Sequence, residues 1–310
     1  MDVFGAWFNL HSLDDFTRFC HLCPHLLTTA VMDQVASMGN IDAITLLHNL
    51  GVSCTPAAMN LAAKYGHIEV VLFLHNFRHE GCTTSAMNWA AEFGHLDVVE
   101  FLHAHRREGC TKAAMTRAAK AGHVDVVRFL HTNRADGGYR DMLQGAIAAG
   151  HVHVVDFLTR NRPKEPCSAL AMDLAARGGH LEMVQYLHLH RKEGCTPQAL
   201  AEAAANGHLE VVKYLLSLEK PFKYDAAMAA AATMGSIPII DILARFVDTK
   251  DCREAVEVAA KHNHMDVLQW FQQHKPKAIA KAKSRAHLHD NRHLVQMLTK
   301  LQECSLETLA

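Results

Sequence analysis

GCTKAAMTRAAKAGHVDVVRFLH, residues 109–131, is the clearest copy of a motif that recurs along most of this 310-residue chain. The motif returns about every 28 residues, and its Gly-His pair can be followed from copy to copy. The glycines of these pairs are Gly66, Gly94, Gly122, Gly150, Gly179 and Gly207. A fixed period of this length is typical of one supersecondary unit stacked many times, so the sequence predicts a solenoid.

Each copy of the motif is expected to form two short helices. Thr111 is a suitable N-cap for the first helix, because its hydroxyl can accept a hydrogen bond from a first-turn amide. The apolar residues that follow have helical spacing, at Ala114, Met115, Ala118 and Ala119. Gly122 is predicted to end this helix in the left-handed conformation, and Asn263 replaces that glycine in a later copy. Residues 123–131 form the second helix, and since nothing alternates with period two, we expect an all-α chain.

The composition excludes several classes of protein. The net charge is -1, so no global field attracts nucleic acid or an anionic membrane. The N-terminal residues start acidic and do not resemble a secretory signal. Because no apolar run reaches about 18 residues, no membrane span is expected. These features predict a cytoplasmic protein, with a nuclear location as a second possibility.

Nine cysteines could suggest disulfide bonds, but the repeat argues against them. Six of them share one repeat position, at Cys54, Cys82, Cys110, Cys167, Cys195 and Cys252. Stacked helices lie about 10 Å apart, beyond the limit of roughly 7 Å between the Cα atoms of a disulfide. We therefore predict six buried, free thiols in the seam between repeats.

The repeats divide the chain into four segments. Residues 1–21 are predicted to form an N-terminal capping helix, which carries Phe4, Trp7, Phe8, Leu13 and Phe16. Residues 22–276 form the repeat array. Residues 277–298 read as a degenerate C-terminal capping repeat, which gives about ten repeats in all. The tail, residues 299–310, is expected to be poorly ordered.

Four copies carry the fold-defining letters most clearly: AAKYGHIEVVLFL, AAEFGHLDVVEFL, AAKAGHVDVVRFL and AAANGHLEVVKYL. This pattern resembles the hallmark of the ankyrin repeat, and the resemblance extends from about Leu26 to Leu298. The family's usual unit has 33 residues, whereas this one has about 28 and starts Thr-x-x-Ala-Met. The missing residues lie where ankyrins project a β-hairpin finger. We therefore predict a short-repeat form with reduced or absent fingers. The resemblance implies binding of other proteins, without catalysis or cofactors.

The chain contains 24 histidines, which raises the question of a metal site. In ankyrins the histidine of the Gly-His pair is structural and bonds loop backbone, as the resemblance implies here. A second set ends the second helices, but its members should lie about 10 Å apart, too far to share a zinc ion with bonds near 2 Å. The best local candidate is Cys20-His21-Leu22-Cys23-Pro24-His25, which lacks a second half-site. We expect no metal ion and no cofactor.

Catalytic motifs are missing from the sequence. It contains no Walker loop, Gly-rich dinucleotide turn or nucleophile elbow. Most of its acidic residues recur with the repeat at the start of the second helices, so they do not form a catalytic pair. The sequence therefore does not predict an enzyme.

A basic run lies near the C-terminus. Its cationic residues, set against one acid at Asp290, are Lys275, Lys277, Lys281, Lys283, Arg285 and Arg292. They could form a nuclear-import signal or contact nucleic acid. They could also be the solvated face of a capping helix, which is the interpretation that short basic runs favour.

The two letters between Ala-Ala and Gly-His vary from repeat to repeat. In ankyrins this pair lines the concave recognition surface, and we carry it over by that alignment. Leu61 and Tyr65, like Trp89 and Phe93, are four residues apart and share a helix face. Tyr65 and Phe93 are expected to be exposed, whereas Trp89 could be buried or exposed. The predicted partner-binding residues are Leu61, Lys64, Tyr65, Trp89, Glu92, Phe93, Arg117, Lys120 and Arg177.

The sequence thus predicts a scaffold or adaptor that binds a partner protein on the concave surface of the first helices. The chain alone is expected to be monomeric. Two alternatives stay open. One is a nucleic-acid-associated protein that uses the basic C-terminal end. The other is a structural or self-assembling repeat array.

Overall fold

The structure is a computed structural model of the whole chain. It describes residues 12–134, 139–161, 167–218, 220–248, 252–288 and 292–307, without the side chains of 287, 288 and 302–307. These residues form helices and turns and no strand, which confirms the all-α prediction. Contacts divide the chain into two compact units. The first comprises Met1–Ala146 and His153–Glu165, and the second comprises Ile147–Val152 and Pro166–Ala310.

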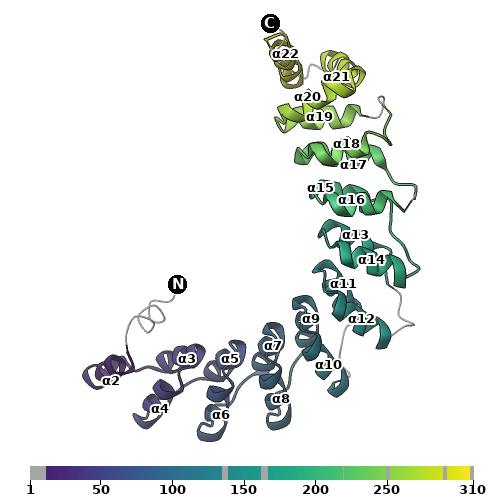
Figure 1. Cartoon of the computed structure of the whole chain (residues 1–310). Coiled ribbons are helices and arrows are strands. Elements are labelled where there is room, and N and C mark those ends of the chain that lie inside the picture. The colour runs from purple at the N-terminus through teal and green to yellow at the C-terminus, as the bar shows by residue number, and fades with distance from the viewer. Residues whose placement is uncertain are drawn as a thin grey trace. The chain divides into compact units, whose positions relative to one another are not determined.

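The first unit is a stack of helix pairs (Figure 1). It begins with α2 (Leu13–Leu22) and the short 3-10 helix η1 (Pro24–Leu26). The pairs that follow are α3 (Thr29–Met38) with α4 (Ile41–Asn49), α5 (Pro56–Lys64) with α6 (Ile68–Phe77), α7 (Thr84–Phe93) with α8 (Leu96–His105), and α9 (Lys112–Ala121) with α10 (Val124–Asn133). Helices α3, α5, α7 and α9 pack in one row, and α4, α6, α8 and α10 in a second row. These are repeats one to four. Repeat five consists of α11 (Tyr139–Ala148) and α12 (Val152–Asn161).

The second unit repeats this arrangement. Its pairs are α13 (Leu170–Arg177) with α14 (Leu181–His190), α15 (Ala199–Ala205) with α16 (Leu209–Leu216), α17 (Tyr224–Met234) with α18 (Ile237–Leu243), α19 (Arg253–Lys261) with α20 (Met265–His274), and α21 (Pro276–Leu288) with α22 (Arg292–Glu307). Here α13, α15, α17, α19 and α21 pack one against the next, and α14, α16, α18 and α20 form the second row. These pairs are repeats six to ten.

The core runs through each unit as a seam between the helix rows. The first helices bury pairs of alanines, such as Ala62 and Ala63 or Ala90 and Ala91, at 0% exposure. The second helices bury larger residues, including Val98, Val99 and Leu102 in α8. Small residues on the first helices let neighbouring helices approach closely, which a stacked array requires.

The Gly-His turns have the conformation that the sequence predicts. Gly94 ends α7 with φ 82° and Gly122 ends α9 with φ 88°, both left-handed. Asn263, the replacement in repeat nine, has φ 59°. The predicted cap is also present, because the Thr111 hydroxyl accepts a hydrogen bond from the Ala113 amide at 3.2 Å.

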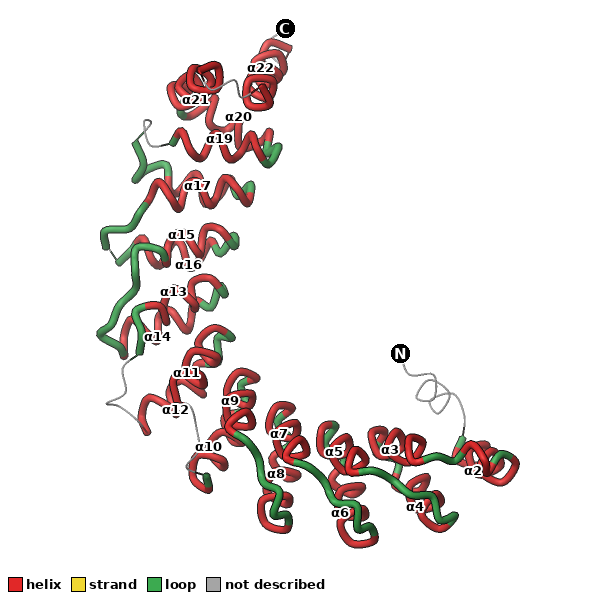
Figure 2. The backbone as a smooth tube through the Cα atoms, turned by 180° about the vertical axis from the view of Figure 1, so that it is seen from behind, coloured by secondary structure: helices red, strands yellow, loops and turns green. Residues whose placement is uncertain are grey.

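Where the structure describes them in full, the connections between repeats are short and contain no β-hairpin finger (Figure 2). Residues 78–83 join α6 to α7, and residues 106–111 join α8 to α9, without a strand. The loss of the β-hairpin accounts for the 28-residue period.

The ends of the array and the thiols differ in part from the predictions. The described part of the N-terminal helix starts at Leu13, and the expected residues Phe4, Trp7 and Phe8 lie outside the described residues. The domain boundary expected at residue 298 falls inside α22, which continues to Glu307. Every cysteine of the described side chains is free. However, the expectation that all six repeated thiols are buried is wrong for three half-buried ones, Cys82, Cys110 and Cys195.

Candidate functional site

The predicted binding residues of repeats two to four lie on α5, α7 and α9, which pack side by side, with Tyr65 as the C-cap residue of α5. We call this group the first-helix patch: Leu61, Lys64, Tyr65, Trp89, Glu92, Phe93, Arg117 and Lys120. Tyr65 is 49% exposed and Phe93 is 47% exposed, so both rings face solvent as predicted. Leu61 and Trp89 are half-buried. For Trp89, this lies between the two possibilities that the sequence left open.

Lys64 lies at the centre of the aromatic part of this patch. Its ammonium nitrogen is 5.0 Å from the ring centroid of Tyr65, 5.8 Å from that of Trp89 and 5.5 Å from that of Phe93. A cation within about 6 Å of a ring is attracted by the negative face of the ring. Three rings from two adjacent repeats therefore hold one side chain, and they fix a positive charge among apolar surfaces.

Beside the rings, α7 and α9 are joined by an ion pair. A guanidinium nitrogen of Arg117 donates to a carboxylate oxygen of Glu92 at 2.7 Å. The two side chains are 46% and 36% exposed. Lys120 is exposed on the same helix as Arg117. The structure thus brings eight of the nine predicted residues together on the first helices of three consecutive repeats.

Arg177, the ninth predicted residue, belongs to the second unit. Its guanidinium forms two hydrogen bonds with the carboxylate of Glu202, at 2.8 and 3.0 Å, which joins α13 to α15. Because Arg177 lies on α13, it is not part of the first-helix patch of repeats two to four.

The turns behind the patch are fixed by contacts between repeats. The His95 ring nitrogen Nε2 hydrogen-bonds the carbonyl oxygen of Lys64 at 3.1 Å. The same contact recurs from His67 to Ser37, from His208 to Arg177 and from His264 to Thr233, at 2.9 to 3.0 Å. These bonds confirm the structural role predicted for this set of histidines. Since His95 holds the end of α5, it also fixes the backbone that carries Lys64 and Tyr65.

A family model described as ankyrin repeats (three copies) matches residues 31–113, 59–141, 87–166 and 142–226. These overlapping matches cover more than half of the chain. The chain belongs to the ankyrin-repeat family. A comparison with curated proteins gives no match. Ankyrin repeats are in general modules for protein–protein interaction and are typically not enzymes.

Besides the histidine bonds at the turns, a second set of recurring hydrogen bonds joins the first helices of this ankyrin array. The sequence analysis missed this set. The Asn60 side chain accepts from the Thr83 amide at 2.9 Å and donates to the Thr83 hydroxyl at 3.0 Å. Asn88 bonds Thr111 in the same way. The sequence signal for these bonds was an Asn or Asp that stands 22 or 23 residues before a threonine, in the pairs Asp33–Thr55, Asn60–Thr83, Asn88–Thr111 and Asp173–Thr196.

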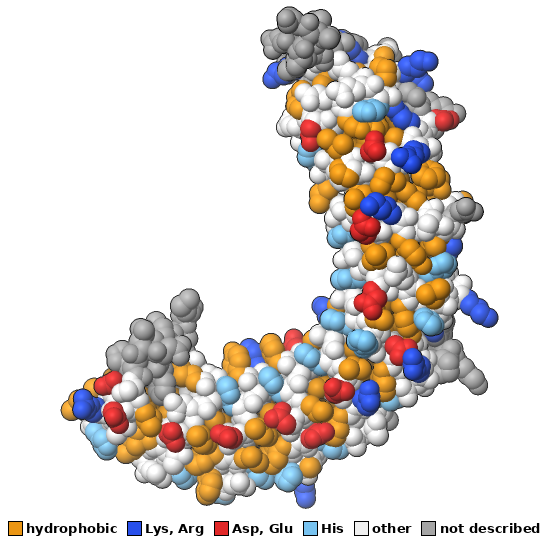
Figure 3. All heavy atoms as spheres, viewed as in Figure 1, with side chains coloured by type: hydrophobic (Ala, Val, Ile, Leu, Met, Phe, Trp, Pro, Cys, Tyr) orange, Lys and Arg blue, Asp and Glu red, His pale blue; other side chains and the backbone are white. Residues whose placement is uncertain are grey.

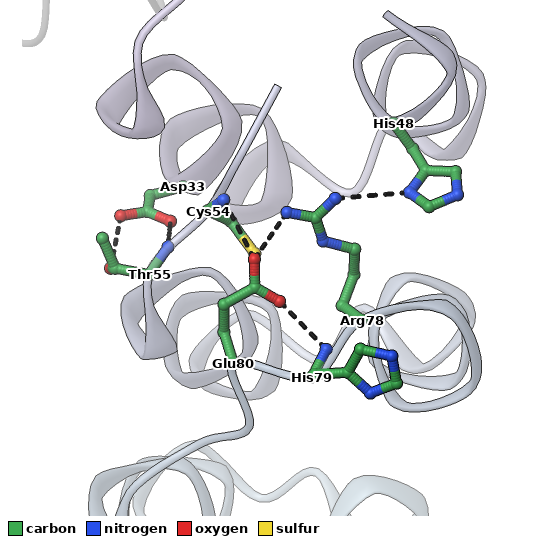
Figure 4. A network of polar contacts seen from close by, with 7 residues as sticks. All are labelled: Asp33, His48, Cys54, Thr55, Arg78, His79 and Glu80. Carbon is green, nitrogen blue, oxygen red and sulfur yellow. Dashed lines mark hydrogen bonds and ion pairs between the residues drawn. The ribbon is translucent and has the colours of Figure 1, made fainter. Parts of the chain in front are cut away.

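The loops between repeats contain a further network (Figure 4). The Glu80 carboxylate accepts from the Arg78 guanidinium in its own loop and from the Cys54 amide of the preceding loop. Burial alone would raise the pKa of Glu80, but these hydrogen bonds outweigh it and lower the pKa to about 2. The Cys54 thiol is buried beside this carboxylate, and its pKa is raised to about 11. The recurring letters Arg-x-Glu-Gly-Cys, at 78–82, 106–110 and 191–195, carry this network, which the sequence analysis also missed.

The histidines that end the second helices pack against aromatic rings of the next repeat. His48 lies edge-on to Phe73 with ring centroids 5.5 Å apart, and His75 lies edge-on to Phe101 at 5.3 Å. Burial, with help from Arg106 and His105, lowers the pKa of His75. Among the described residues, no group of three His, Cys, Asp or Glu side chains is arranged to hold a metal ion. In the metal candidate that the sequence offered, residues 20–25, the Cys20 thiol is buried, and this burial raises its pKa.

The basic C-terminal run is only partly a surface feature. The ammonium of Lys275 donates to the backbone carbonyls of Ala244 and Val247, where it closes the end of α18. Lys277, Lys281 and Arg285 are exposed on α21 at i, i+4 and i+8.

The face of the molecule in Figure 3 shows acidic, basic and hydrophobic side chains interspersed. None of the described helices is long and apolar enough to cross a membrane.

Proposed function

We propose that this protein is a non-catalytic scaffold or adaptor that binds a partner protein through the first-helix patch. The observation that carries the proposal is the cluster of Tyr65, Trp89 and Phe93 around Lys64. Two of these rings are about half exposed, although the hydrophobic seam of the array lies elsewhere. Aromatic side chains clustered in this way are common anchors of protein interfaces.

The backbone beneath the patch favours binding. The Asn–Thr bonds tie α5 to the start of α7 and α7 to the start of α9, and the His95 bond to the Lys64 carbonyl ties the end of α5 to the next repeat. A partner therefore meets side chains whose backbone is already fixed, so little backbone entropy is lost on association. Around the rings, the polar groups of Glu92, Arg117 and Lys120 form a solvent-accessible rim, as in many interfaces.

The experiment compares the proteins that the wild type and the double variant Tyr65→Ala/Phe93→Ala capture from a native lysate, by quantitative mass spectrometry. We expect at least one protein to be captured by the wild type and reduced roughly 30-fold or more with the variant. Loss of a pair of interface anchors commonly removes 2 kcal/mol or more of binding free energy, and about 1.4 kcal/mol corresponds to tenfold.

The matched control is Phe77→Ala. Phe77 is 57% exposed on α6, a second helix of the same repeat as Tyr65. Capture should be unchanged by this variant, while circular dichroism shows that both variants are folded. If the double variant is folded and captures the same proteins as the wild type, the first-helix patch is not the binding surface.

A second candidate function, contact with nucleic acid, rests on the exposed stripe of Lys277, Lys281 and Arg285. Replacement of all three by Gln should then abolish binding of a fluorescent duplex DNA or RNA, and binding by the wild type should weaken steeply with salt. Absence of binding by the wild type at low salt removes this candidate. We favour the first function because the stripe has three charges in a chain of net charge -1.

We also propose a monomeric chain in the cytoplasm or nucleus. The free thiols favour a reducing compartment. Light scattering of the purified protein tests the monomer, and imaging of a fluorescent fusion tests the location. A concentration-dependent increase in mass would favour a self-assembling array instead.

A further inference from the structure

The charges around the first-helix patch are unbalanced. The charged residues of α5, α7 and α9 are four basic ones and one acidic one. The basic ones are Lys64, Lys112, Arg117 and Lys120, and the acidic one is Glu92. By contrast, the second helices of the same repeats begin with exposed acids, at Glu69, Asp97 and Asp125. The first-helix row is thus the basic side of these repeats.

The single acid of this row is already satisfied. Glu92 accepts the hydrogen bond from Arg117 at 2.7 Å. Lys64 instead contacts ring faces, and no carboxylate of the described residues lies within 4.0 Å of its ammonium nitrogen. A ring face attracts a cation but leaves its N–H groups able to donate to another acceptor. Lys64 therefore presents a donor and a positive charge at the centre of three apolar surfaces.

We infer that the partner presents an acidic segment in which Asp or Glu stands next to a large apolar side chain. This inference rests on the proposed function and specifies the chemistry of the partner. The carboxylate pairs with Lys64, and the apolar side chain packs on the exposed faces of Tyr65 and Phe93. Further carboxylates of the segment are attracted by Lys120 and Lys112. Because the rings hold Lys64 in place, pairing loses less side-chain entropy than with a free lysine.

The alternative for the three rings is a cation supplied by the partner. That arrangement would place a second positive charge beside Lys64, on a row of helices that also carries Arg117 and Lys120. Since Glu92 is the one acid on these three helices and is paired, like-charge repulsion disfavours it. The charge of the surface therefore favours an anionic partner.

The experiment selects a displayed library of random peptides on the wild-type protein, with counter-selection on Tyr65→Ala/Phe93→Ala. We expect the selected sequences to be enriched in Asp or Glu adjacent to Phe, Leu or Trp. A synthetic peptide of that sequence should bind about tenfold or more weakly to Lys64→Ala, as expected for a charge-assisted hydrogen bond. Lys64→Arg should keep most of the affinity, and binding should weaken with added salt.

The outcomes separate this inference from the proposed function. Peptides that need Tyr65 and Phe93 but show no acidic preference, and whose affinity is unchanged in Lys64→Ala, overturn the inference and leave the patch as a binding surface. Basic peptides that bind Lys64→Ala more tightly than wild type overturn it in favour of a partner cation between the rings. If no selected peptide depends on Tyr65 and Phe93, both the inference and the proposed function fail.

Discussion

At the Gly-His turns nearly every repeat offers its neighbour the same side chain, whereas the two residues before that glycine change along the chain. They are Lys64-Tyr65 in repeat two but Ala205-Asn206 in repeat seven. At the turns, the imidazole of one repeat bonds the backbone of the previous one, so any change is felt by two repeats. On the first-helix face, side chains at this pair of positions can vary without breaking the seam. The comparison teaches that the residues that stabilise the stack and the residues proposed for recognition occupy adjacent positions of the same unit.

The largest expected effect concerns the turns. Gly179 has φ +73°, and a Cβ atom there would lie 2.4 Å from Nδ1 of His208. Gly179→Ala must therefore strain the backbone, displace the imidazole and weaken its bond to the Arg177 carbonyl. We expect a loss of about 3 kcal/mol in the free energy of unfolding, by adding the left-handed penalty, one hydrogen bond and some overpacking. Urea unfolding followed by circular dichroism measures it.

The next repeat supplies the control for this prediction. Gly207 has φ +76°, but Ser236 stands where the following histidine would be, and a Cβ atom at Gly207 would lie 3.7 Å from the Met234 methyl group. Gly207→Ala should then lose only the left-handed penalty, about 1 kcal/mol. Equal losses in the two variants would show that the histidine does not constrain the glycine.

The loop network gives the second-largest effect, and it depends on pH. The pKa of Glu80 is lowered from an ordinary 4.5 to about 2, so its contribution is present above pH 4.5 and is lost as the pH falls through about 2. Since the side chain is 26% exposed, we expect Glu80→Gln to lose about 1–2 kcal/mol at pH 7, less than the full shift implies. The difference from wild type should shrink between pH 4.5 and pH 2 in urea unfolding.

The matched control lies on the first-helix face. Glu92 also pairs with an arginine, but both side chains are more than one-third exposed. Glu92→Gln should therefore change the free energy of unfolding by roughly 0.5 kcal/mol or less. If Glu92→Gln lowers the free energy of unfolding as much as Glu80→Gln, then the loop network does not differ from the first-helix patch in its contribution to stability.

The sequence predicted much of this difference between the constant turns and the variable first-helix positions. The period predicted the helix pairs, and Asn263 at a glycine position correctly indicated positive φ there. The exposure of Tyr65 and Phe93 followed from their place between Ala-Ala and Gly-His. These features depend on local sequence patterns that recur in many repeats.

Contacts between neighbouring repeats were harder to predict from the sequence. Glu80 bonds an amide 26 residues earlier, and Lys64 lies over rings that belong to the next repeat as well as its own. Helical periodicity places a residue on a face but does not give the rotamer that reaches across to the next helix. The half-buried Cys82, Cys110 and Cys195 show the same limit, because they share one sequence position with the buried Cys54, Cys167 and Cys252.

Removal of the exposed rings should have a smaller effect on stability. Tyr65 and Phe93 are about half exposed, so Tyr65→Ala/Phe93→Ala should lower the free energy of unfolding by about 1 kcal/mol or less. Circular dichroism and urea unfolding measure it. A double variant that fails to fold would assign these rings to the core and would remove the interface proposed for them.

The smallest expected effect compares two lysines at one repeat position. Lys64 is followed by Tyr65 and contacts three rings, whereas Lys120 is followed by Ala121 and is exposed. Cation–π contacts at exposed sites contribute about 0.5–1 kcal/mol, so Lys64→Ala should lose about 0.5 kcal/mol and Lys120→Ala close to nothing. Because so small a difference approaches the error of unfolding curves, NMR gives the sharper measurement. Ring currents should shift the Lys64 side-chain protons next to the ammonium upfield of those of Lys120, and Phe93→Ala should reduce the shift. Equal shifts for the two lysines would mean that the rings do not hold Lys64, and the first-helix patch would then lose the fixed charge at its centre.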